Sequence, residues 1–599
     1  MILSASGWRD IFAYDGEAES RSTRISGFHK FFSAASASVF VDFIRKKTQN
    51  GLIRIIVGLD TRPTGMSIAK NIIRTILAKD AHAIFCGVTA APEIMAYARA
   101  LGGKGAADGF IYISASHNPI GYNGIKFGLT DGGVLGGADM AQLAAGFYAL
   151  RESQNASSLL LESLNSVKSS VLNKALSEAP RFKQEALAAY MEFSNITAAG
   201  GQEFVLTELK NTINITPLGI AADFNGSART LSIDKVFFEN FGLKFAAINA
   251  KAGEIVHRIV PEGDSLIPCL DFLSELRQDN PDFILAYTPD CDGDRGNIVF
   301  FDENANFVRP LEAQEVFALA CLSELCQLVW LGGAHLDEKG SLRKTAVAVN
   351  DATSMRIDRI ANAFGAVVFR AETGEANVVN LGRRLRAEGW TTPVMGEGAA
   401  GGSIIHPSSV RDPLQTVTAL LKLLRIRSRS GKKGFFEIWQ ERCGLKKPYS
   451  NDFNLSDVIA SLPAFITTSA YSADAGLQIV SGDHARLKER YQNIFLREWH
   501  EKESRLHSEW GICAWEAFSY NGSEERRDVD HFGDSGRGGL RICFYNESGS
   551  QCASIWMRGS GTEPVFRVMA DVDAGNSALE RALLSWHRGM VLEADKERD

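Results

Sequence analysis

The chain has 599 residues and a formal net charge of -7 at pH 7, with 45% hydrophobic and 23% charged residues. These proportions are close to globular averages and exclude a globally disordered or fibrous chain. The negative charge and the scattered basic residues argue against a nucleic-acid partner. The N-terminus has no leader pattern, and no apolar run reaches the roughly 20 residues of a membrane span. We therefore expect a cytoplasmic protein that binds no membrane.

The nine cysteines are spread along the chain. No C-x-x-C pair occurs, and no closely spaced pair of histidines stands near any of them. Zinc-site spacing is therefore absent, and we expect ordinary buried thiols.

Strand-like and helix-like segments alternate in the first 115 residues. The apolar run 53–59 predicts a strand that ends at Asp60, and the isoleucines that follow, such as Ile68 and Ile72, recur at helical spacing. Further strands are predicted at 83–86 and 109–113, with a helix between them. This alternation is typical of an α/β domain.

The same alternation restarts twice further along the chain. Residues 218–224 and 283–286 predict strands of a second unit, and strands at 346–349 and 366–369 enclose the predicted helix 354–363 of a third. Single cores stop growing at roughly 250 to 300 residues, so a chain of this length needs several domains. We predict three similar α/β domains with mixed sheets.

Two regions depart from this pattern. Residues 132–185 are rich in Ala, Ser and Leu, which predicts helices with a surface insertion at 152–180. Near the C-terminus, residues 540–544 and 554–557 alternate like strands after the Gly-rich stretch 521–539. This end of the chain predicts a fourth, α+β domain.

A polar turn follows the predicted strand 109–113. It reads Ser114-Ala115-Ser116-His117-Asn118-Pro119, and Lys126 stands ten residues after Ser116. Ligands of open α/β sheets gather at the carboxyl ends of strands, and an exposed serine beside a base or a cation is a possible nucleophile. Taken alone, the same residues also suit a turn with capping side chains.

A second polar segment carries three alternating carboxylates. Asp290, Asp292 and Asp294 follow a predicted buried strand, Gly293 permits a tight bend, and Arg295 stands beside them. Carboxylates so close together repel one another unless a divalent cation lies between them. An EF-hand needs a glutamate at position 12 of its loop, which this segment lacks, so Mg²⁺ is the predicted metal. A serine, a metal site and basic residues together favour phosphoryl transfer.

Two glycine-rich segments suit ligand binding. In Arg558-Gly559-Ser560-Gly561-Thr562-Glu563-Pro564, small residues expose backbone amides and a guanidinium is available, as in a phosphate cradle; the alternative is a hairpin turn with a salt bridge. In the segment 396–403, Glu397 can accept hydrogen bonds from sugar hydroxyls, and a flexible turn suits the composition equally well. No P-loop lysine follows either segment.

These four segments, in this order, resemble the α-D-phosphohexomutase family, which includes phosphoglucomutase and phosphomannomutase. Further matches are Ser6-Gly7-Trp8-Arg9, similar to the family's N-terminal substrate loop, Gly58-Leu59-Asp60-Thr61-Arg62, and Asp223-Phe224-Asn225-Gly226. The resemblance implies four domains around a central cleft. We predict a catalytic-serine domain with a helical insertion at 1–197 and a metal-binding domain at 198–307. Residues 308–447 would form a sugar-recognition domain, and residues 448–599 a phosphate-binding domain.

The resemblance also implies residue roles. Ser116 would carry the phosphoryl group and, with Asp290, Asp292 and Asp294, ligate Mg²⁺. Lys126 and Arg295 would be the basic pair beside the reacting oxygen, with His117 as a neighbouring contact. The substrate-binding residues would be Arg9, Glu397, Arg558, Ser560, Gly561 and Thr562. Two positions depart from the family pattern, since Ala399 and Ala371 stand where a serine and a threonine are usual.

The implied activity is a phosphohexose mutase that interconverts hexose 1-phosphate and hexose 6-phosphate through a phosphoserine enzyme. Hexose 1,6-bisphosphate would be the intermediate and the activator, and a small-molecule sugar phosphate the partner. Glucose phosphate is the first choice and mannose phosphate the second. Two alternatives stay open at this point: a sugar-phosphate binding protein without turnover, and a phosphatase in which water intercepts phospho-Ser116.

Overall fold

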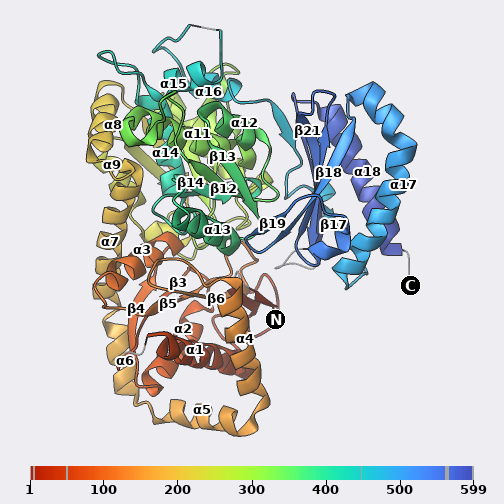
Figure 1. The fold of residues 1–599 in the computed structure, drawn as a ribbon. Helices are drawn as coiled ribbons and strands as arrows, with labels where there is room; N and C mark the ends of the chain where they lie inside the picture. The colour runs from red at the N-terminus through yellow and green to blue at the C-terminus, as the bar shows by residue number, and fades with distance from the viewer. Residues whose placement is uncertain (1, 5–6, 49–50, 447, 560–564, 597–599) are drawn as a thin grey trace. The chain divides into compact units, whose positions relative to one another are not determined.

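The chain forms two compact units in a computed structural model that describes residues 2–4, 7–48, 51–446, 448–559 and 565–596 (Figure 1). The first unit comprises Met1–Leu311 and Ile404–Ile426, and the second Glu312–Ser403 and Arg427–Asp599. The described residues form four sheets with helices packed against them. The predicted α/β class with mixed sheets is confirmed. The boundaries of the four predicted domains stay predictions.

The first sheet of the first unit has six strands. In spatial order these are β1 (Ile2–Ser4), β2 (Gly7–Ile11), β6 (Tyr122–Gly128), β5 (Gly109–Ile113), β3 (Arg54–Leu59) and β4 (His82–Val88). β3 pairs in parallel with β4 and β5, whereas β6 runs antiparallel to β5 and β2 antiparallel to β6. The predicted strands 53–59, 83–86 and 109–113 are confirmed within a few residues. The antiparallel half, β1, β2 and β6, was not predicted.

Alternating side chains of β3 divide between the two faces of this sheet. Ile55, Val57 and Leu59 join the core that includes helices α1 (Gly27–Thr48) and α2 (Gly65–Ala78). On the opposite face, a Cβ on Gly58 would lie 2.7 Å from Ile94 of α3 (Ala91–Gly102), so the strand and the helix are in close contact there. Helices therefore cover both faces of the sheet, as the largely apolar strands predict.

Helices fill the segment predicted to be an insertion. α4 (Gly137–Glu152), α5 (Gln154–Ser166) and α6 (Ser169–Ser177) lead into α7 (Ala179–Ala199). The helical prediction is confirmed, but the segment is more than a surface addition. α5 and α6 pack on α2 and bury Leu160, Leu164, Leu172 and Ala175.

The second sheet of this unit has five strands, four of which repeat the arrangement of β6, β5, β3 and β4 in the first sheet. Its order is β11 (Phe307–Pro310), β10 (Gly296–Asp302), β9 (Phe283–Pro289), β7 (Gly219–Asp223) and β8 (Lys244–Ile248). β7 pairs in parallel with β8 and β9, and β10 returns antiparallel to β9. The helices are α8 (Glu203–Ile215), α9 (Asp234–Asn240), α10 (Ile267–Asp279) and the later α14 (Pro413–Arg425), which packs on α7 and α8. In both sheets a parallel strand, β5 or β9, is followed by a polar loop and an antiparallel strand.

The second unit begins with a four-stranded sheet. Its order is β13 (Val367–Ala371), β12 (Ala346–Asn350), β14 (Val394–Glu397) and β15 (Gly402–Ile405), and β12 is parallel to both neighbours. The helices of this region are α11 (Ala313–Leu331), α12 (Arg356–Phe364), α13 (Glu375–Ala387), α15 (Phe435–Arg442) and α16 (Leu455–Ala460). Among the described helices, α11 alone is long and apolar enough to span a membrane, and 78% of its apolar window is buried inside the fold. Such burial is typical of a core helix.

The last sheet is antiparallel. Its order is β16 (Phe465–Thr467), β22 (Phe566–Asp573), β21 (Gln551–Gly559), β20 (Gly539–Tyr545), β18 (Ala514–Asn521) and β19 (Glu524–Arg526), with β17 (Gly476–Leu477) also paired to β22. Helices α17 (His484–Trp510) and α18 (Ser577–Lys596) pack together beside it (Figure 1). This arrangement confirms the predicted α+β character of the C-terminal region and both of its predicted strands. The 27-residue helix α17 was not predicted.

Candidate functional site

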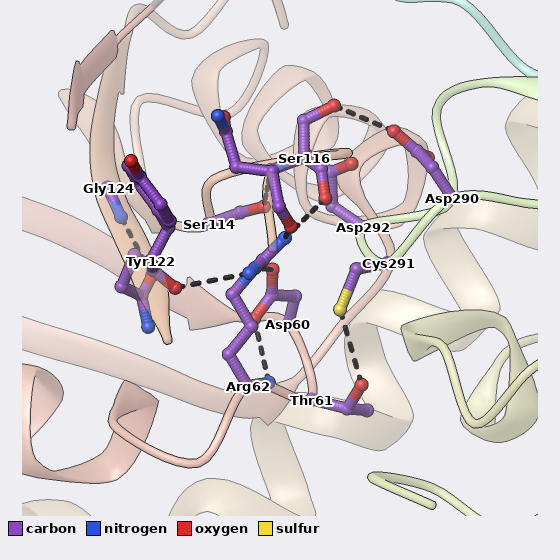
Figure 2. Close-up of polar contacts among 12 residues, drawn as sticks. Asp60, Thr61, Arg62, Ser114, Ser116, Tyr122, Gly124, Asp290, Cys291 and Asp292 are labelled. Carbon is purple, nitrogen blue, oxygen red and sulfur yellow. Dashed lines mark hydrogen bonds and ion pairs between the residues drawn. The ribbon is translucent and has the colours of Figure 1, made fainter. Parts of the chain in front are cut away.

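The two polar loops of the first unit meet at the carboxyl ends of their strands. Ser116 lies in the loop after β5, and Asp290 is the first residue after β9. The Ser116 hydroxyl donates a hydrogen bond to Oδ2 of Asp290 at 2.7 Å (Figure 2). The structure therefore brings together two motifs that lie 174 residues apart in the sequence.

Three buried carboxylates converge in the second loop. Oxygen atoms of Asp290, Asp292 and Asp294 lie within 4.8 Å of one another, and none of the three residues is more than 1% exposed. Gly293 has a φ of +71°, and a Cβ there would lie 2.5 Å from the Arg229 side chain. The tight bend predicted at Gly293 is thus confirmed, and only glycine fits it without strain. Backbone N–H groups of Gly293 and Arg295 donate to Oδ1 of Asp290.

Basic side chains compensate part of this negative charge. Nζ of Lys126 lies 2.6 Å from Asp292 and 3.7 Å from Asp294, and the Arg411 guanidinium lies 2.9 Å from Asp294. Burial alone would raise the pKa of Asp294, but Arg411, Lys126 and Arg295 outweigh it and hold that pKa well below its usual range. Asp294 is therefore ionised at neutral pH.

Asp290 is in the opposite situation. Burial, and then repulsion by Asp292 and Asp294, raise the pKa of Asp290 well above its ordinary value. Within the described part of the chain, Oδ1 of Asp292 and Oδ1 of Asp294 are buried and accept no hydrogen bond. Unpaired carboxylate oxygens around one point are what a hard divalent cation requires, so the three aspartates fit Mg²⁺.

His117 and Arg9 lie within the electrostatic reach of the same cluster. Burial, followed by the charges of Arg295 and Arg9, lowers the pKa of His117 well below its ordinary value, so its imidazole is neutral at physiological pH. Burial and Arg295 lower the pKa of Arg9 to about 10. Arg9 extends from β2 and donates to Oδ1 of Asn118 at 2.9 Å, so it contacts the serine loop directly.

Two further groups support the acidic loop, and the sequence analysis missed both. Arg411 binds Asp294, and Arg229 donates to the Gly293 carbonyl as well as to Asp234 and Asp412. The Arg229 side chain is fully buried. Neither arginine stands near the acidic loop in the sequence. One local sequence signal marks a partner of Arg229: Asp412 stands before Pro413, a pattern that predicts the N-cap of a helix, here α14.

The substrate-binding candidates other than Arg9 belong to the second unit. Glu397 ends β14 and its Oε1 accepts a hydrogen bond from the backbone N–H of Gly374 at 2.9 Å. Arg558, near the end of β21, donates from Nε to Oε1 of Glu372 at 2.9 Å, and its Nη2 lies 2.8 Å from the same oxygen in an ion pair. Ser560, Gly561 and Thr562 lie outside the described residues.

The cysteines depart from the predicted burial at three positions, most clearly at Cys513. Six of the nine are buried, Cys443 and Cys552 are partly exposed, and Cys513 is exposed. Cys513 also lies close to His507 and Glu547, which hydrogen-bond to each other at 2.9 Å. Cys513 is therefore not an ordinary buried thiol, because it stands just after the glycine that ends α17 at the surface.

Two family models match the chain. "Phosphoglucomutase/phosphomannomutase, alpha/beta/alpha domain I" matches residues 14–154, and "Phosphoglucomutase/phosphomannomutase, alpha/beta/alpha domain III" matches residues 327–442. The first region holds Ser116 and Lys126, and the second holds Glu397.

Curated relatives and solved structures agree with these models. A phosphoglucosamine mutase of Clostridium botulinum is 28% identical over 306 residues, which are 51% of this chain and 56% of the relative. The matched region thus spans just over half the length of that relative. A phosphoglucomutase/phosphomannomutase of Thermococcus kodakarensis is 25% identical over 480 residues, covering 76% of this chain and 89% of the relative.

Two solved structures share the fold along the whole chain. The open form of parafusin from Paramecium, described as a phosphoglucomutase, has a TM-score of 0.63 at 14% identity and covers 100% of this chain and 96% of that one. A phosphoglucomutase/phosphomannomutase family protein of Burkholderia thailandensis has a TM-score of 0.60 at 15% identity and covers 100% and 98%.

The fold and the site define an α/β protein of two compact units, in which a buried serine hydrogen-bonds to one of three clustered aspartates. The comparisons describe this chain more narrowly. Residues 14–154 and 327–442 match domains I and III of the phosphoglucomutase/phosphomannomutase family, and the chain is similar in sequence and in fold to members of the α-D-phosphohexomutase superfamily.

Proposed function

We propose that the protein is a phosphohexose mutase that interconverts hexose 1-phosphate and hexose 6-phosphate through phospho-Ser116. The observation that carries this proposal is the 2.7 Å hydrogen bond from the Ser116 hydroxyl to Asp290, inside a buried cluster of three aspartates. A serine held against a metal-type site suits reversible phosphoryl transfer, since catalysis of that reaction is mainly positioning and electrostatic stabilisation.

The proposed metal ligands are Asp290, Asp292, Asp294 and an oxygen of Ser116 or of its phosphoryl group. Bound Mg²⁺ would supply positive charge to the oxygens of the transferring phosphoryl group. The unpaired, buried oxygens of Asp292 and Asp294 support this ligand set.

Proton movement accompanies the transfer. The substrate hydroxyl loses a proton as its oxygen bonds to phosphorus, and Oγ of Ser116 gains a proton as the P–Oγ bond breaks. We assign this proton movement to Lys126, which Asp292 holds at 2.6 Å in the same cluster. The second transfer, from the bisphosphate back to Ser116, runs the same steps in reverse.

Fixed positive charge completes the proposed site. Arg295 would face the transferring oxygens, and neutral His117 would contact the phosphoryl group as a hydrogen-bond partner rather than as a cation. Arg9, bonded to Asn118, would bind substrate beside the serine loop.

The substrate's remaining contacts are proposed from the second unit. Glu397 would accept from sugar hydroxyls. Arg558 would bind the distal phosphate with Ser560, Gly561 and Thr562, and the phosphate would then replace Glu372 as its partner.

Glucose phosphate is the proposed substrate and mannose phosphate the second candidate. Relatives named phosphoglucosamine mutase add a third candidate, glucosamine phosphate. The proposed activator is the corresponding hexose 1,6-bisphosphate, and the proposed location is the cytoplasm.

The test is a panel of hexose and hexosamine 1-phosphates, each with a trace of its 1,6-bisphosphate and Mg²⁺. A 6-phosphate product supports the mutase. Release of inorganic phosphate favours a phosphatase, and binding without any product favours a sugar-phosphate binding protein.

Ser116→Ala should abolish turnover and the phosphoserine mass increment while substrate still binds. Ser36→Ala is the matched control, because Ser36 is also a buried serine, but its hydroxyl donates to the backbone carbonyl of Phe32 on α1 and not to a carboxylate. Turnover retained by Ser116→Ala would remove the nucleophile assignment.

A further inference from the structure

We propose that Arg62 is a positioning residue, which fixes the Ser116 loop in the geometry that phosphoryl transfer requires. This inference rests on the proposed function. It concerns a residue that does not touch the three aspartates and acts only through the serine loop, as the following contacts show.

The Arg62 guanidinium binds the loop through backbone carbonyls alone. Nη2 donates to the carbonyls of Ser116 and Asn118 at 2.7 and 2.6 Å, and Nη1 donates to those of Pro119 and Tyr122. Figure 2 shows the contacts to Ser116 and Tyr122. Four carbonyls between residues 116 and 122 thus converge on one side chain. A planar guanidinium can bind them together because its donors point in fixed, divergent directions.

Asp60 holds this guanidinium in place. Its Oδ2 accepts from Nε of Arg62 at 3.2 Å, and its Oδ1 accepts from the Arg62 backbone N–H at 2.9 Å. Both side chains are 0% exposed. Asp60 follows the end of β3, where its backbone N–H bonds the Ile113 carbonyl of neighbouring β5. The pair is therefore anchored to the two central parallel strands rather than to the loop.

The loop needs such an anchor because its conformation is unusual. Ser116 has a φ of +53°, in the left-handed region that residues with a side chain rarely adopt. Its N–H donates to Oγ of Ser114 at 2.8 Å, and its carbonyl is the one that Arg62 binds. Hydrogen bonds therefore hold both the backbone N–H and the backbone carbonyl of Ser116, while its hydroxyl donates to Asp290.

The loop is also packed closely on β6. A Cβ on Gly124 would lie 2.6 Å from the Ser114 carbonyl oxygen, so the loop cannot relax towards that strand. Arg62 acts on a second residue as well: it binds the carbonyl of Asn118, whose side chain accepts from Arg9. One buried guanidinium therefore binds the backbone of both Ser116, the proposed nucleophile, and Asn118, the loop residue that Arg9 contacts.

The test compares wild type with Arg62→Lys. A lysine has one nitrogen and cannot reach all four carbonyls, so the loop should lose its fixed geometry. Misplacement of a reacting group by about 1 Å costs on the order of 100-fold in rate. We expect kcat, and the rate at which hexose 1,6-bisphosphate phosphorylates Ser116, to fall by about that factor. KM should stay within about two-fold, because the substitution replaces none of the side chains that we assign to substrate binding.

A second variant and a control guard against simple unfolding. Asp60→Asn with Arg62→Met removes the ion pair without leaving a lone buried charge, which would by itself destabilise the fold. Arg356→Lys is the matched control, since Arg356 is a buried arginine of the second unit that donates to the carbonyl of Phe465 at 2.7 Å. It should leave kcat and Ser116 phosphorylation unchanged.

The outcomes separate this inference from the proposed function. If wild type forms no phosphoserine at position 116, the proposed function fails and the inference falls with it. If wild type is phosphorylated and Arg62→Lys matches its rates, or raises KM at unchanged kcat, only the inference is overturned. Failure of both Arg62 variants to fold would also overturn it, in favour of a purely structural role.

Discussion

The metal-free protein should be destabilised by Asp290 as the pH rises. In the absence of a cation this carboxyl is 0% exposed, and burial with repulsion from Asp292 and Asp294 raises its pKa. Because the folded-state pKa exceeds the unfolded value, the folded protein retains a proton that the unfolded chain releases. The stability from this group is full below the unfolded pKa and is lost as the pH rises through the raised value. Asp290→Asn has no proton to lose, so its metal-free form should lack this decline.

Magnesium should reverse the effect in wild type. A ligand at about 100 times its Kd adds roughly 2.7 kcal/mol to the free energy of unfolding. The first unit has about 330 residues, and unfolding entropy is roughly 2.1 cal/mol/K per residue, so this corresponds to about 4 °C in Tm. In Asp290→Asn most of this shift should be absent, because one of three carboxylate ligands is replaced by a neutral amide.

Scanning calorimetry on chelator-treated protein, from about pH 5 to about pH 8 with and without Mg²⁺, measures both effects. Asp302→Asn is the control, because Asp302 is a buried carboxylate of the same sheet, paired with Arg309, that lies outside the trio. It should keep the full Mg²⁺ shift. The reasoning is refuted if metal-free Asp290→Asn declines with pH as wild type does, or gains as much from Mg²⁺.

Three further predictions concern the second unit. Arg558→Lys should raise KM by about 10- to 100-fold, as expected for hydrogen bonds to a charged group, with a smaller change in kcat; steady-state kinetics would contradict the assignment if kcat alone fell. Burial lowers the pKa of His587 to about 4. The contribution of His587 to the free energy of unfolding is therefore complete above about pH 6.5, and about 3 kcal/mol of it should be lost as the pH falls towards 4. Denaturant titrations at several pH values check this, and His587→Gln should remove that part of the slope. A thiol reagent should modify exposed Cys513 first in the native protein, and Cys513→Ser should abolish that fast phase; equal labelling of the six buried thiols would contradict the fold.

Local patterns in the sequence were enough to predict the α/β class and many of its strands. The strand 109–113 occurs at those residues, and the strands predicted at 53–59 and 346–349 differ from the observed ones by one residue at one end. Continuous apolar runs in a parallel sheet are visible without tertiary information. The antiparallel strands β2 and β6 were missed. Both carry charged or polar residues, such as Arg9 and Lys126, whose burial depends on partners elsewhere in the chain.

The sequence by itself determined which residues we propose for the chemistry, since Ser116 and the alternating aspartates are chemically distinctive where they stand. The tertiary structure decided their surroundings: Ser116 meets Asp290 across 174 residues and Arg411 meets Asp294 across 117. It also showed that Arg62 binds the carbonyls of the serine loop. Contacts at such separations leave no periodic or local signal, because they form only when strands from distant parts of the chain end beside one another.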